Sequence, residues 1–104
     1  MKVIRDFENR RIRLTPERLA HILEHPEMAG MSDSIANVIA VPERAVQSIS
    51  DSGARLYYRY FFDTAMGGKY LCVVVKIHDH DAFVLTAYLT DRIKKGVPIW
   101  PRKL

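Results

Sequence analysis

The chain has 104 residues and a formal net charge of +4, from 16 Lys and Arg against 12 Asp and Glu. This length predicts one domain whose core needs no metal or disulfide, and a lone cysteine, Cys72, excludes an internal disulfide. Cys72 lies in an apolar segment and is expected to be a small buried side chain, as in a reducing compartment. No leader and no run of ~18 apolar residues is evident, so we expect a soluble cytoplasmic protein with no membrane partner.

The first third of the chain predicts a hairpin followed by a helix. Short apolar stretches at residues 3–5 and 11–14 flank a polar segment and indicate two strands. Residues 15–17, Thr-Pro-Glu, have the pattern of an N-cap and the first turn of a helix. We expect this helix to run to about His25, because Pro26 disfavours helical geometry in the residue before it.

The rest of the chain changes from helical to extended periodicity. A second helix is predicted from a Ser32-Asp33 cap through Val41. Apolar and aromatic runs separated by short turns then predict four strands, at residues 46–50, 56–62, 70–77 and 83–88. The sequence therefore predicts an α+β domain over residues 1–104, in which an N-terminal hairpin and two helices pack on one face of an antiparallel four-stranded meander.

The last predicted strand carries two hydroxyl groups and runs into a basic turn. Thr86 and Tyr88 are two residues apart, so both lie on one face of the strand, roughly 6 to 7 Å from each other. They either position a phosphate and stack a base, or are simply good strand formers. Arg92, Lys94 and Lys95 follow and either extend a phosphate-binding surface or form a solvated surface.

These elements and several short motifs resemble a known nuclease superfamily. The motifs are residues 14–27 around His21, the strand around Arg59, and residues 68–76 and 85–88. From about residue 11 to residue 100 the chain is similar to phage-associated members of the barnase, EndoU, colicin and RelE-like superfamily. The resemblance implies a metal-independent ribonuclease that leaves 2′,3′-cyclic phosphate ends and needs no cofactor. It also implies a toxin of a mobile element or toxin–antitoxin pair, with RNA and an antitoxin or immunity protein as partners.

Histidines on the first helix are candidates for acid–base chemistry. Cleaving RNA without a metal needs a base, an acid and cations beside the phosphoryl oxygens, and histidine serves as either base or acid near neutral pH. The resemblance points to His21, with a structural hydrogen-bonded role as the alternative; His25, one turn later, shares its cleft, caps the helix or contacts the loop. Their spacing also fits a zinc pair, but Ile22 stands where the metalloprotease motif has glutamate, so we predict no metal site.

Arg59 interrupts an aromatic run in the second predicted strand. Strict alternation places it on the same face as Tyr57 and Phe61. There it is either a surface residue with a packed aliphatic stem or a phosphate-binding group stacked on a ring, and the resemblance favours the second reading. Lys76, and more weakly Lys69, flank the next strand as candidate RNA contacts or as ordinary edge charges.

The combined prediction is a metal-independent endoribonuclease. Its predicted catalytic residues are His21, Arg59, Thr86 and Tyr88, and its predicted RNA-binding residues are Lys76, Arg92, Lys94 and Lys95. The alternative is a non-catalytic phage or mobile-element protein-interaction domain of the same fold, which binds a partner through its sheet or through residues 97–101. In that segment Trp100 is either a lid on the core or an exposed docking anchor.

Overall fold

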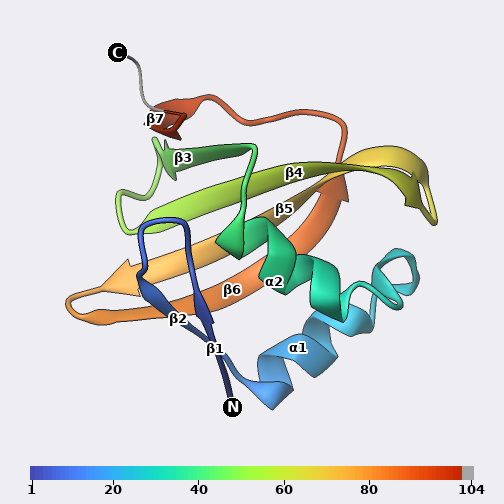
Figure 1. The fold of residues 1–104 in the computed structure, drawn as a ribbon, viewed down its shortest axis with the longest axis horizontal. Coiled ribbons are helices and arrows are strands. Elements are labelled where there is room, and N and C mark those ends of the chain that lie inside the picture. The colour runs from blue at the N-terminus through green and yellow to red at the C-terminus, as the bar shows by residue number, and fades with distance from the viewer. Residues whose placement is uncertain (102–104) are drawn as a thin grey trace.

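The computed structural model describes residues 1–101 and has two helices on one face of a seven-stranded mixed sheet (Figure 1). The strand order is β1-β2-β6-β5-β4-β3-β7. The elements in chain order are β1 (Lys2–Arg5), β2 (Arg11–Leu14), α1 (Pro16–Leu23), the 3₁₀ turn η1 (Pro26–Met28), α2 (Ser32–Ala40), β3 (Arg44–Ser48), β4 (Ala54–Thr64), β5 (Gly67–His78), β6 (Asp81–Thr90) and β7 (Gly96–Trp100). The predicted α+β class is confirmed.

The sheet contains the predicted meander and extends it at both edges. Strands β3 to β6 pair antiparallel in chain order, as predicted. The predicted hairpin β1–β2 joins them through a parallel contact of β2 with β6, where Arg13 lies opposite Phe83. At the other edge β7 pairs antiparallel with β3. The predicted four-stranded meander is thus present, but the hairpin extends its sheet instead of packing on one face, and β7 was not predicted. Strand β7 contains Pro98, which an edge strand tolerates.

The two helices begin in different ways. Thr15 caps α1 as predicted, since its side-chain oxygen accepts a hydrogen bond from the Arg18 backbone N–H at 3.2 Å. The helix ends at Leu23, short of the predicted His25. The predicted side-chain cap of α2 was wrong, because Met31 occupies the N-cap position and makes no capping bond. No helix in residues 1–101 is long and apolar enough to cross a membrane.

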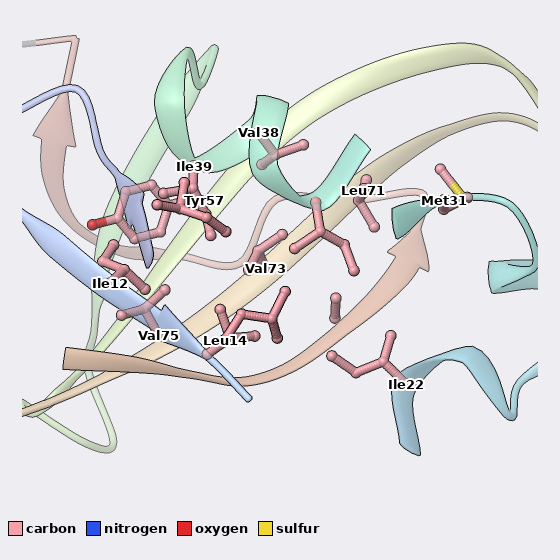
Figure 2. Close-up of a cluster of buried hydrophobic side chains, with 14 of the residues drawn as sticks. Ile12, Leu14, Ile22, Met31, Val38, Ile39, Tyr57, Leu71, Val73 and Val75 are labelled. Carbon is pink, nitrogen blue, oxygen red and sulfur yellow. The ribbon is translucent and has the colours of Figure 1, made fainter. Parts of the chain in front are cut away.

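The helix-covered face of the sheet is the main hydrophobic core. Figure 2 shows its side chains interdigitating between the helices and the strands, among them Ile12, Leu14, Ile22, Val38, Ile39, Tyr57, Leu71, Val73 and Val75. Tyr57 is fully buried, and its hydroxyl donates a 2.6 Å hydrogen bond to the Asp6 carboxylate. Asp6 also accepts from the backbone N–H groups of Glu8 and Arg10, which satisfies its buried charge.

The other face of the sheet, here called the open face, carries a smaller cluster beneath a loop. Val46, Leu56, Tyr58 and Cys72 are buried there, although no helix covers them. The connection between β6 and β7, residues 91–95, crosses this face and packs Ile93 against the cluster. The backbone N–H of Lys94 donates to the Tyr58 hydroxyl at 3.1 Å, which fixes the loop on the sheet.

Candidate nucleic-acid-binding groove

The two histidines of the prediction lie on the helical layer, at and just after α1. His21 is exposed, with its Nδ1 atom 3.5 Å from the Glu24 carboxylate. The Nδ1 atom of His25 lies 3.9 Å from the Glu27 carboxylate. Each histidine therefore has its own acidic neighbour at the molecular surface.

Arg59 lies on the helix-covered face, with Tyr57 and Phe61, as strand alternation predicted. Its Nη1 atom donates a 2.9 Å hydrogen bond to the backbone carbonyl of Val41, the residue that ends α2. A cation at this position satisfies a free carbonyl and interacts favourably with the negative end of the helix dipole. In this structure Arg59 is thus engaged as a cap of α2.

Thr86 and Tyr88 lie together on the open face, opposite Val74 and Cys72 of β5. This agrees with their predicted common face. Arg59 is on the opposite face of the sheet, and His21 is on the helical layer. The structure therefore brings Thr86 and Tyr88 together and separates them from the other two predicted catalytic residues.

The Tyr88 hydroxyl belongs to a largely buried polar cluster with Cys72 and Tyr58. Burial raises the pKa of the Cys72 thiol to about 11, although hydrogen bonds from the two tyrosines act in the other direction. Burial, followed by the neighbouring Cys72, also raises the pKa of Tyr58 and of Tyr88. At neutral pH all three groups keep their protons, so the cluster supplies hydrogen-bond donors and neither a nucleophile nor a base.

A basic groove lies beside this cluster, between the 91–95 loop and strands β3 and β7, of which β7 is the edge strand. Its volume is about 380 Å³. Its lining residues are Arg44, Val46, Ile93, Lys94, Lys95, Gly96, Pro98, Trp100 and Pro101. Three of them are cationic and none is acidic. Among residues 1–101, no carboxylate forms an ion pair with Arg44, Lys94 or Lys95.

Several other basic side chains are held by acidic partners. The ion pairs are Arg13 with Asp81 at 2.6 Å, Arg55 with Glu8 at 2.7 Å, Lys69 with Asp91 at 2.5 Å, and Lys76 with Asp51. Lys76, a predicted RNA contact, is thus paired with a carboxylate, and it does not line the basic groove. Arg92, another predicted contact, lies in the 91–95 loop, but it is not among the groove-lining residues. Of the predicted RNA-binding residues, Lys94 and Lys95 are the two that line the groove.

The groove depends on the close approach of β7 to β3. A Cβ atom at Gly96 would lie 2.4 Å from the Gln47 carbonyl oxygen, so only glycine fits this register. Trp100 contacts the Phe7 ring, with ring centroids 5.5 Å apart, and remains 40% exposed. Phe7 packs against the helix-covered core, so the Trp100 ring packs on that side, while Trp100 is also among the residues that line the groove. Its role as a docking anchor stays a prediction.

Sequence reasoning missed Arg44 as a groove residue. The third strand was predicted to begin at residue 46, which left Arg44 in a turn after the second helix. In the structure Arg44 begins β3 opposite Tyr58. No sequence signal placed it beside Lys94 and Lys95, since that contact depends on how the 91–95 loop crosses the sheet.

A second pocket, of about 390 Å³, has the opposite charge. It lies between the start of α2 and the β4–β5 hairpin, and its lining includes Glu27, Asp63, Phe61 and Phe62 but no Lys or Arg. Two carboxylates without a cation repel a phosphate. The basic groove is therefore the better candidate for a polyanionic ligand.

Comparisons of the chain with protein-family models, with curated proteins and with solved structures found no match. The resemblance to the nuclease superfamily thus stays a prediction. The functional argument rests on the geometry of the chain itself.

Proposed function

We propose that this chain is an RNA-binding domain that holds the phosphate backbone in the basic groove. The observation that carries this proposal is the convergence of Arg44, Lys94 and Lys95 on one groove, without acidic partners among residues 1–101 and with the partly exposed Trp100 among the lining residues. Clustered cations bind phosphate oxygens, and an accessible aromatic ring stacks on an unpaired base. The combination fits a nucleic acid better than it fits an acidic protein surface, which offers no bases to stack.

The groove is organised before RNA arrives. The hydrogen bond from the Lys94 backbone to the Tyr58 hydroxyl and the packing of Ile93 hold the 91–95 loop against the sheet. Arg44 projects from a paired strand, where its planar guanidinium can bind a phosphate through two parallel hydrogen bonds. Less ordering on binding means a smaller entropic cost.

This arrangement supports RNA binding without turnover, which differs from both the ribonuclease and the protein-interaction domain of the sequence analysis. The residues that line the groove include no His, Asp, Glu or Cys, side-chain types that commonly serve as general bases. His21 lies on the helical layer. Ribonuclease activity therefore stays a prediction, and binding is the function that the geometry favours.

A salt series with labelled single-stranded RNA tests the proposal. Each phosphate contact contributes about 0.7 to the slope of log affinity against log salt for a single strand. Replacing Lys94 and Lys95 by Ala should therefore weaken binding and make the slope shallower by about 1.4. The matched control is the double variant of Lys2 and Arg11 to Ala, which removes two exposed charges at the β1–β2 edge of the sheet and should leave the slope near that of the wild type.

The control also distinguishes the competing basic surface near the N-terminus. If the Lys2 and Arg11 variant lowers the slope while the Lys94 and Lys95 variant matches the wild type, RNA binds at the hairpin and the basic groove is not the site. If the wild-type protein binds no RNA at low salt, the proposed function is rejected.

A further inference from the structure

A row of aromatic rings continues from the basic groove along the open face. Tyr58, Tyr70, Tyr60 and Phe62 form successive edge-to-face contacts, with centroid separations of 6.3, 5.1 and 5.0 Å. Exposure increases along this series: Tyr58 is fully buried, Tyr60 is 37% exposed and Phe62 is 84% exposed. We refer to Tyr70, Tyr60 and Phe62 as the aromatic row.

The register of the sheet places this row next to the groove. Arg44 lies directly opposite Tyr58, and Tyr60 is two residues further along the same face of β4. Two residues along a strand span roughly 6 to 7 Å. Figure 1 shows β4 and β5 extending beyond β3 and β7 toward the β4–β5 hairpin. The row therefore leads away from the groove, along the part of β4 that no longer pairs with β3.

Glu43 and Asp91, two carboxylates that adjoin the row, are already engaged. The Glu43 side chain accepts a hydrogen bond from the Tyr60 backbone N–H at 2.5 Å. Asp91 follows Thr90, which lies opposite Tyr70, and it forms the ion pair with Lys69. Asp63 lines the acidic pocket together with Phe62, at the end of β4 where the pairing with β5 is irregular after Phe61. A polyanion that approaches from the groove as far as Tyr60 thus meets carboxylates that are ion-paired or hydrogen-bonded, and Asp63 adjoins the row at its Phe62 end.

We propose that the aromatic row binds unpaired bases of the RNA whose phosphates occupy the basic groove. This inference rests on the proposed function and specifies the class of ligand: a single strand several nucleotides long, not a duplex. An exposed ring stacks on any base, and each such stack contributes about 1 to 3 kcal/mol. The bases of a duplex are stacked on each other and present no face to Phe62.

The prediction concerns the length of RNA that the protein binds. Affinity for single-stranded RNA should rise from a dinucleotide, which fills the groove alone, to an octanucleotide, which also reaches the row. Phe62→Ala should lower the affinity for the octanucleotide about tenfold, the value of one base stack, and leave the dinucleotide unaffected. Its salt slope should equal that of the wild type, because no phosphate contact is lost.

Two further variants make the experiment specific. Phe62→Trp keeps a stacking surface and should retain the octanucleotide affinity, with quenching of the new indole fluorescence on binding. Ile49→Ala is the matched control, since Ile49 is 75% exposed and follows β3 at the β3–β4 turn. It should bind like the wild type.

The outcomes separate the two proposals. If the wild-type protein binds RNA in the groove but Phe62→Ala has the same affinity at every RNA length, the row is not a binding surface. The groove then remains the proposed binding site. Equal affinity for a duplex and a single strand of the same length would also contradict the proposal that the row binds unpaired bases. Absence of RNA binding by the wild type overturns both.

Discussion

Arg59 illustrates how far a single residue can be understood from its sequence neighbours. Alternation along β4 correctly placed it with Tyr57 and Phe61, because side chains on a strand point to opposite faces in turn. Alternation does not say which face the helices cover. Since α2 ends above this face, the guanidinium of Arg59 binds the carbonyl of Val41.

Cys72 gives a prediction on how stability depends on pH. Burial raises its pKa from 9.0 to about 11, so the unfolded chain releases the thiol proton at a lower pH than the folded protein does. The contribution of the neutral thiol to stability is therefore complete below about pH 9 and is lost as the pH rises toward 11. The raised pKa values of Tyr58 and Tyr88 extend this loss to higher pH. Chemical denaturation between pH 7 and about 11 should show a falling free energy of unfolding.

Cys72→Ala is the control for the thiol. It removes the titrating group and leaves a small cavity, which lowers stability at every pH. Its free energy of unfolding should nevertheless fall less steeply above pH 9 than that of the wild type. Parallel curves would show that Cys72 does not contribute to the alkaline loss.

At the scale of elements, the sequence predicted the strands that have strong β-forming runs and missed the one that lacks them. The meander was found because aromatic and β-branched residues alternate along β4, β5 and β6, and the short turns between them require antiparallel neighbours. Strand β7 contains Pro98, and the sequence analysis predicted no strand there, only a C-terminal segment at residues 97–101. Its pairing depends on tertiary contacts of Gly96 and Trp100, which periodicity does not encode.

The register of β7 carries a prediction at Gly96. Gly96→Ala places a methyl group against the Gln47 carbonyl oxygen and the Val46 side chain, so β7 must move away from β3. Such overpacking typically costs about 1 to 3 kcal/mol. We expect lower stability in chemical denaturation and weaker RNA binding, although the charge of the groove is unchanged.

Gly53→Ala is the matched glycine variant for this test. The nearest atom to its Cβ would be the Ile77 carbonyl oxygen at 3.2 Å, so a small adjustment accommodates it, and it lies in the turn before β4, outside the groove lining. It should keep the RNA affinity of the wild type. If Gly96→Ala also keeps full affinity, the position of β7 is not part of the binding site.

At the scale of the whole molecule, the candidate site was predictable only in part. Lys94 and Lys95 were identified because a cluster of cations after a strand is visible in the sequence. Arg44 lies far from them in the chain and meets them only through the path of the 91–95 loop over the open face, whereas Trp100 follows Lys95 closely in the sequence. The predicted catalytic residues lie apart in the structure, with Thr86 and Tyr88 on the open face and Arg59 on the helix-covered face, because the sequence did not show which face the helices cover.

The position of the basic groove relative to the helices leads to the final prediction. In Figure 1, α1 lies at the opposite end of the molecule from β7, and the strand order separates β6, which α1 contacts, from β7 by three strands. RNA titrated into isotope-labelled protein should therefore shift the backbone amide signals of residues 44–46 and 93–96 and leave those of α1 unchanged.

The same set of shifted signals should appear with a chelator present, because phosphate is held by side-chain cations. His21→Ala should bind RNA like the wild type. Shifts centred on α1, together with RNA cleavage to 2′,3′-cyclic ends that His21→Ala abolishes, would instead place a ribonuclease site on the helical layer.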